Sequence, residues 1–102
     1  MVKKNSNGNG ENPDIFHGQE VIYPVSFEMK SVMVFSNNDS DNKERLEQVF
    51  IDQKVDFRFV SNKASSKGAY MSYTYHITLT SKKQLDNVYR ALKTVKGLKF
   101  AL

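Results

Sequence analysis

The 102-residue chain contains no cysteine, which excludes disulfide bonds, thiolate metal sites and a cysteine nucleophile. The absence of cysteine also fits a reducing cytoplasm. No apolar run is long enough to cross a bilayer, and the lysines near the first residue are not followed by the apolar stretch of a signal peptide. We therefore expect a cytoplasmic protein that does not associate with a membrane.

Residues for catalysis are equally scarce. The five glycines form no phosphate-binding loop, since neither GxGxxG nor a Walker A pattern is present. The two histidines are His17 and His76, and neither has another histidine or a carboxylate at metal-ligand spacing. No set of general acid, base and nucleophile can be assembled. The sequence thus predicts no catalytic, cofactor-binding or metal-binding residues, and a protein that is not an enzyme.

The length allows one domain and is too short for two. Residues 1–21 are rich in Asn, Gly, Ser and Lys and have no apolar periodicity, so they are predicted to form a disordered N-terminal extension. Ile15 and Phe16 are its only sizeable apolar residues. Residues 22–102 are predicted to form the domain.

Apolar spacing within the domain predicts alternating strands and helices. Residues 71–79 alternate strictly between apolar and polar, which is typical of a half-buried strand. After a capping box at Ser81 and Gln84, a helical stripe with Gly97 as its C′ residue follows. Earlier segments predict a strand at 25–35, a helix capped by Asp41, and a strand around Phe57 and Phe59. The apolar phase of the first strand switches near Lys30, which indicates either a β-bulge there or a strand that is buried on both faces. The helical stripe after Ser81 consists of Leu85, Val88, Tyr89, Leu92 and Val95. Residues 98–102 then predict a last short strand.

The order of elements is βαββαβ. Right-handed crossovers place both helices on one face of a four-stranded antiparallel sheet, so the fold class is α+β, a ferredoxin-like sandwich. The first helix carries Leu46, Val49 and Phe50 at helical spacing. The core is predicted to include these residues and the helical stripe of residues 85–95, together with Phe57, Phe59, Tyr73, Tyr75, Ile77, Leu79, Leu98 and Phe100. The face without helices is predicted to show Arg58, Ser72, Thr74, His76 and Lys99.

One segment carries a family resemblance. The run Ser65-Ser66-Lys67-Gly68-Ala69-Tyr70 is followed by Ser72, then by Gln84-Leu85 with Tyr89 and Leu92 in the same helix, and by a final strand. This order resembles the YbeD-like family, small bacterial proteins of unknown function, over about residues 22–102. The resemblance implies a ferredoxin-like fold, a cytoplasmic location and likeness to small regulatory domains of the ACT type. ACT domains bind amino acids with a Gly-bearing loop after the first strand, and the corresponding residues 36–40 contain no glycine.

The same run is the first candidate contact site, made of Ser65, Ser66, Lys67, Gly68 and Tyr70. Gly68 suits a turn with positive φ, and the serines supply local hydrogen bonds, so the segment reads equally well as a plain hairpin connection. The long charged side chain of Lys67, however, has no role in the geometry of a turn. Tyr70 lies in the phase opposite to Tyr73, so its ring is expected on the face that the helices leave open.

A second candidate is a basic patch formed by Lys83, Arg90 and Lys93. Residues 82–99 hold six Lys or Arg side chains against one Asp, and the formal net charge of the chain is +4. The patch is either an anion-facing surface or the solvated face of a helix whose last cations offset the helix dipole.

These observations predict a small non-catalytic binding or regulatory module that contacts a protein or a small anion. The alternative is RNA binding through the basic second helix and last strand. An RNA-recognition domain stacks bases on aromatic rings of its open sheet face, and here Tyr73 and Tyr75 are assigned to the core. The sequence gives no indication of the oligomeric state.

Overall fold

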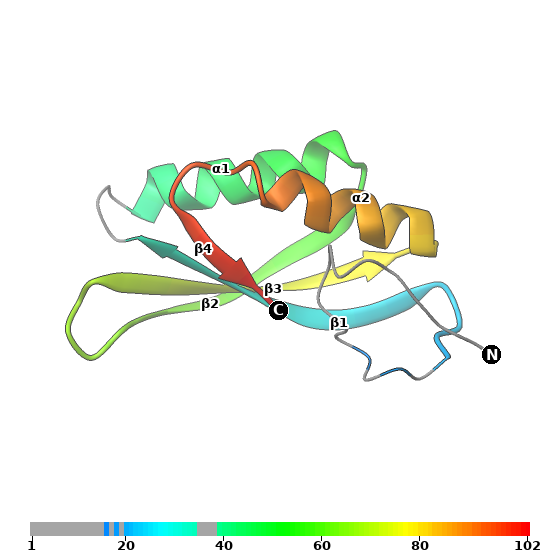
Figure 1. The fold of residues 1–102 in the computed structure, drawn as a ribbon, viewed down its shortest axis with the longest axis horizontal. Coiled ribbons are helices and arrows are strands. Elements are labelled where there is room, and N and C mark those ends of the chain that lie inside the picture. The colour runs from blue at the N-terminus through cyan, green and yellow to red at the C-terminus, as the bar shows by residue number, and fades with distance from the viewer. Residues whose placement is uncertain (1–15, 17, 19, 35–38) are drawn as a thin grey trace.

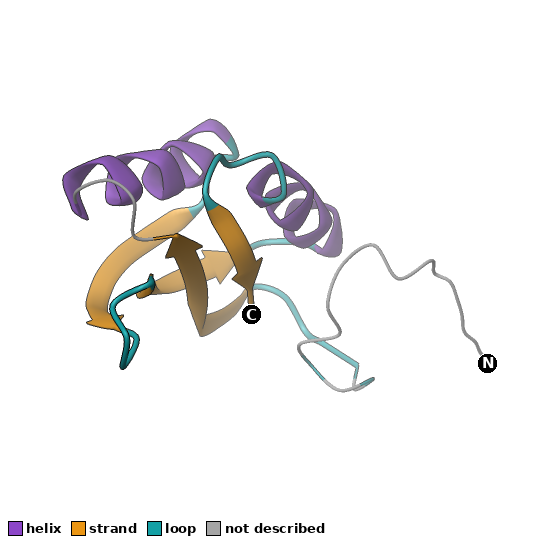
Figure 2. Cartoon of the chain, turned by 60° about the vertical axis from the view of Figure 1, so that its left-hand side comes forward, coloured by secondary structure: helices purple, strands orange, loops and turns teal. Residues whose placement is uncertain are grey.

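The computed structural model describes residues 16, 18, 20–34 and 39–102. Six elements follow one another in the predicted order. They are β1 (Val25–Val34), α1 (Asp39–Asp52), β2 (Asp56–Ala64), β3 (Tyr70–Leu79), α2 (Lys82–Leu92) and β4 (Leu98–Ala101). The strands form one antiparallel sheet in the order β2-β3-β1-β4, and both helices cover the same face of it (Figures 1 and 2). The predicted ferredoxin-like fold is confirmed.

Strand β3 lies inside the sheet and pairs along its whole length with β1. Its alternate residues are fully buried under the helices, in the phase that the sequence predicted. Tyr73 and Tyr75 are both 0% exposed. The buried core also takes residues from β1, from both helices and from the turn before β2: Met29, Met33, Leu46, Val49, Phe50, Val55, Met71, Ile77, Leu79, Val88, Tyr89 and Leu92.

The hydroxyl groups of the two central tyrosines reach helix α1. Tyr73 accepts a hydrogen bond from Asn42 Nδ2 at 3.2 Å, and Tyr75 donates one to Glu47 Oε2 at 2.8 Å. Burial and this hydrogen bond to a carboxylate both raise the pKa of Tyr75 far above its ordinary value. Since a buried hydroxyl without a partner is costly, these bonds let two large rings serve as core and fix α1 over β3.

Strand β1 shows no bulge in its pairing with β3 near Lys30, contrary to one of the two expectations for its phase switch. Its odd-numbered residues face the helices throughout, and the buried Ser31 continues this set. The valines in the other phase, Val32 and Val34, are half-buried on the open face. The switch thus arises because both faces of the strand carry apolar residues at this end.

The helix termini differ from the prediction in two places, the start of α1 and the end of α2. Helix α1 begins at Asp39, so Asp41 is not its N-cap. It ends at Asp52. The bonds from Lys54 N to Ile51 O and from Val55 N to Phe50 O form a Schellman motif after it, in which Lys54 has a φ of 59°. Helix α2 ends at Leu92 and is capped by Lys93, so Gly97, with φ 91°, belongs to the following turn and is not the C′ residue.

One of the two hydrogen bonds of the predicted capping box of α2 is present. Ser81 accepts a hydrogen bond from Gln84 N at 3.1 Å. The Gln84 side chain accepts from Thr80 N at 2.7 Å instead of from Ser81, and it donates to the carbonyl oxygens of Gln53 and Lys54. Gln84 therefore ties the start of α2 to the end of α1.

A β-bulge in β4 corrects the predicted core. Leu98 lies opposite Met33 and Phe100 lies opposite Val32, so Lys99 is an extra residue in β4. The bulge reverses the alternation after Leu98, and Phe100 lies beside Val32 on the open side with 51% of its surface exposed. The assignment of Phe100 to the core was wrong, because a period-2 pattern assumes an unbroken ladder.

The predicted domain boundary at residue 22 is not tested by the described residues, and residues 1–15, 17 and 19 lie outside them. Phe16 is described, and its ring contacts Phe27 of β1 edge-on, with the centroids 5.4 Å apart. This contact places one residue of the predicted extension against the sheet.

The packing predicts opposite effects for two neighbouring residues of α2. Leu92→Ala should lower the free energy of unfolding by about 2–5 kcal/mol, because Leu92 is 1% exposed. Arg90→Ala should change it by less than about 0.5 kcal/mol, because Arg90 is exposed. Urea unfolding of both variants measures the difference, and similar small values for the two would contradict the helical phase.

Candidate functional site

The hairpin between β2 and β3 carries the first predicted site. Residues 61–70 are all exposed, and the hairpin extends to one end of the molecule (Figure 1). Ser65 closes the turn through its backbone and its side chain: it donates to Tyr70 O at 2.9 Å, its carbonyl accepts from Gly68 N at 2.9 Å, and its hydroxyl accepts from Tyr70 N at 3.2 Å. The Ser65 side chain is thus accounted for by the turn.

Gly68 has φ 71°, and a Cβ at this position would meet no atom within 4 Å. The requirement for glycine is therefore conformational and not steric. Ser66 and Lys67 form the exposed turn, and neither side chain closes it. The hydrogen bonds of Ser65 and the positive φ of Gly68 account for both residues as parts of a turn. The Lys67 side chain takes no part in these turn hydrogen bonds.

Tyr70 lies on the face of the sheet without helices, opposite Val34, and is 39% exposed. The Lys99 Nζ atom lies 5.9 Å from the centre of its ring, at the outer limit of a cation–π contact. The bulge that exposes Phe100 also brings Lys99 from β4 to this place. We call Val32, Val34, Tyr70, Lys99 and Phe100 the open-face patch.

The remaining predicted residues of the open face are polar. Ser72, Thr74 and His76 are half-buried along β3, and Arg58 lies opposite His76. Because Tyr73 and Tyr75 are buried on the other face, Tyr70 is the only Phe, Tyr or Trp residue that the central strands β1 and β3, both fully described, present on the open face. The rings on which an RNA-recognition domain stacks bases are therefore not arranged here.

The predicted basic patch lies on the outer side of α2. Lys83, Arg90 and Lys93 are all exposed. Lys82 pairs with Asp86 at 3.1 Å, and Arg90 donates to Asn87 Oδ1 at 3.2 Å. The contact of Lys99 with Tyr70 joins the basic last strand to the hairpin site.

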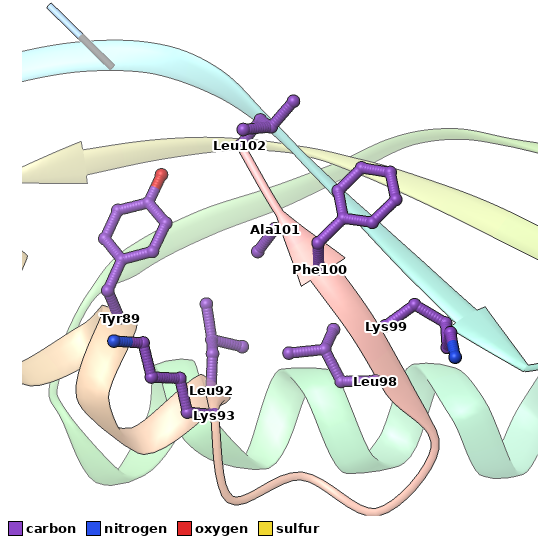
Figure 3. Close-up of a pocket in the computed structure, with 8 residues that line it drawn as sticks. All are labelled: Tyr89, Leu92, Lys93, Leu98, Lys99, Phe100, Ala101 and Leu102. Carbon is purple, nitrogen blue, oxygen red and sulfur yellow. The ribbon is translucent and has the colours of Figure 1, made fainter. Parts of the chain in front are cut away.

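Sequence reasoning missed a groove along the outer edge of the sheet, between α2 and β4 (Figure 3). Its volume is about 340 Å³. It is lined by Tyr89, Leu92, Lys93, Leu98, Lys99, Phe100, Ala101 and Leu102. The sequence contains no signal for it, because Tyr89 reads as ordinary core and the bulge in β4 has no glycine or proline to mark it.

Tyr89 is the unusual member of the groove. The residue is 2% exposed, yet its hydroxyl has no hydrogen-bond partner among the residues that the structure describes. Burial raises the pKa of this hydroxyl well above its ordinary value, so it keeps its proton.

With these sites described, comparison with known proteins identifies the family. Residues 19–102 match a family described as "Protein of unknown function (DUF493)". The chain belongs to this family. The "UPF0250 protein" of Shewanella piezotolerans, which bears the name used for YbeD-like proteins, is 48% identical over 42 residues, 41% of this chain and 48% of that protein. The matched segment thus spans about half the length of the curated relative, and the predicted resemblance to the YbeD-like family is confirmed.

Two solved structures share the fold of this DUF493 chain. The protein HP0495 from H. pylori superposes with a TM-score of 0.62 at 11% identity, covering 92% of this chain and 98% of that one. The ACT domain from the GTP pyrophosphokinase of Chlorobium tepidum superposes with a TM-score of 0.53 at 15% identity, covering 78% and 96%. At these identities the likeness establishes the ferredoxin-like fold alone, and no catalytic function is indicated for the DUF493 chain.

Within residues 16, 18, 20–34 and 39–102, no three His, Asp or Glu side chains gather as a metal site requires. Neither helix of the same residues has the length and apolar character that a bilayer crossing needs.

The unpartnered hydroxyl leads to a stability prediction. Tyr89→Phe should raise the free energy of unfolding by about 1 kcal/mol, because the ring packing stays and a buried polar group without a partner is removed. Thermal and urea unfolding of the two proteins measure the change. Leu92→Ala, which is expected to destabilise, serves as the control, and a loss of stability in Tyr89→Phe would show that the hydroxyl has a partner in solution.

Proposed function

We propose that this DUF493 protein is a small non-catalytic regulatory module of the cytoplasm that acts by binding another protein. The contact surface consists of the hairpin tip at Ser65–Gly68 and the adjoining open-face patch. The observation that carries the proposal is the exposed Tyr70, which lies beside Lys99 on the face without helices.

The chemistry of this surface supports protein binding. Tyr70 offers a large apolar area with a polar tip, and aromatic residues of this kind are enriched at the centres of protein interfaces. Val32 and Val34 extend the apolar area, and Phe100 exposes half of its surface. Lys67 and Lys99 add positive charges at the rim, where charges set orientation and association rate.

The fold also supports a regulatory role, although it does not indicate which residues make the contact. One structural neighbour is an ACT domain taken from a larger enzyme, a GTP pyrophosphokinase. Small domains of this architecture therefore occur as parts of larger assemblies, which fits a module whose effect depends on a partner.

The test compares two contact variants with a matched control. Lys67→Ala and Tyr70→Ala should each leave the melting temperature almost unchanged, because both side chains are exposed, and should each weaken capture of the partner by about tenfold. Affinity capture from the native cells with quantitative mass spectrometry measures the bound proteins. Arg58→Ala, on the same sheet face but outside the patch, should capture as the wild type does.

If Lys67→Ala and Tyr70→Ala capture the same proteins in the same amounts as the wild type and Arg58→Ala, the hairpin is only a turn.

RNA binding is the second candidate, and the exposure of Lys83, Arg90 and Lys93 is the observation in its favour. Binding through such cations should fall steeply with salt, because each phosphate contact releases counterions. Retention on immobilised RNA between low and physiological salt, measured for the wild type and for Lys83→Gln, separates the two candidates. A steep salt slope that Lys83→Gln reduces would favour RNA over a protein partner.

A further inference from the structure

The groove between α2 and β4 is a second site, which lies apart from the hairpin tip and shares Lys99 and Phe100 with the open-face patch. Leu92, Leu98 and Ala101 form its apolar floor, and Phe100 and Leu102 stand at its rim with 51% and 55% of their surfaces exposed. An apolar molecule in the groove would cover both exposed side chains, which is favourable. The volume of about 340 Å³ falls within the range of small-ligand sites.

The polar groups of the groove select an anion. Lys93 is the charged side chain that extends along the groove, because the Lys99 ammonium lies near the Tyr70 ring. The lining contains no Asp or Glu side chain, and the carboxylate of the last residue, Leu102, accepts a hydrogen bond from Lys30 N at 2.8 Å. Lys93 extends from the end of α2 along the side of the groove on which Tyr89 lies (Figure 3). The buried Tyr89 hydroxyl has no acceptor within the described structure, so it lacks the one type of partner that an anion supplies.

The small number of donors favours a carboxylate over a phosphate. A phosphate dianion carries more acceptor oxygens and more hydration, which one hydroxyl and one ammonium group do not replace. A carboxylate has two oxygens, and one hydroxyl and one ammonium group match them. The mostly apolar walls require that the rest of the molecule be apolar.

We propose that the groove between α2 and β4 binds a small monocarboxylate with an apolar body. One carboxylate oxygen accepts a hydrogen bond from the Tyr89 hydroxyl, the ammonium group of Lys93 neutralises the charge, and the body lies on Leu92 and Leu98. The exposed side chains of Phe100 and Leu102 turn aside to admit it, which their exposure allows without disturbing the core. This site does not depend on the proposed protein contact through Tyr70.

The test uses three probes of nearly equal shape: 3-phenylpropionate, its neutral amide 3-phenylpropionamide, and the cation 3-phenylpropylamine. Titration of the ¹⁵N-labelled protein followed by NMR should give saturable shifts for the carboxylate at residues 92–93 and 98–102. The amide and the amine should bind at least about tenfold more weakly, since a hydrogen bond to a charged group is lost. The absence of saturable shifts at millimolar carboxylate, or equal affinity for the three probes, would overturn the proposal.

Two variants assign the polar contacts. Tyr89→Phe and Lys93→Gln should each weaken binding of 3-phenylpropionate by about tenfold and weaken binding of the amide less, because the amide carbonyl accepts from the hydroxyl but carries no charge. Lys83→Gln, on the same helix but outside the groove, is the control and should bind as the wild type does. If Tyr89→Phe binds the carboxylate as tightly as the wild type, the proposal fails.

The groove and the protein contact can be tested independently of each other. Lys67→Ala and Tyr70→Ala, which test the protein contact, should bind 3-phenylpropionate with wild-type affinity, because neither residue lines the groove.

Discussion

The alternation of side chains along β3 is the constraint on which the rest of the structure depends. The strand pairs with β1 on one side and β2 on the other, so its phase determines which face of the sheet is buried. Tyr73 and Tyr75 supply the largest fully buried side chains, and their hydroxyls reach Asn42 and Glu47 of α1. A slip of one residue would expose both rings and break both hydrogen bonds, so one register is strongly preferred.

The same phase decides what the protein presents to partners. Tyr70 faces the side without helices because it lies in the opposite phase from Tyr73, three residues away. The two edge strands depart from strict alternation, each through an extra residue: Val60 in β2 and Lys99 in β4. The bulge at Lys99 exposes Phe100 and helps to form both the open-face patch and the groove, which agrees with the frequent location of bulges at sheet edges and functional sites.

Much of this fold could be predicted from the sequence, because β3 and α2 have apolar patterns of period 2 and 3.6 that their burial follows closely. The end of α1 could not, because the αL position is held by Lys54 where glycine is usual.

Of the two candidate sites, only the hairpin could be predicted from the sequence. The hairpin residues and the outward direction of Tyr70 follow from local pattern. The groove does not, since it requires the bulge at Lys99 and a tyrosine whose hydroxyl has no partner in the described part of the chain. A hydrophobic stripe at helical spacing assigns Tyr89 to the core and says nothing about its oxygen.

The phase of β3 is the central claim, and the reactivity of its tyrosines tests it most directly. The native protein can be treated with tetranitromethane, which nitrates accessible tyrosine rings, and the products located by peptide mass spectrometry at increasing times. Tyr70 should be nitrated first, while Tyr73 and Tyr75 should react only when the protein is unfolded in urea. Nitration of Tyr73 or Tyr75 as fast as Tyr70 in the native protein would contradict the account.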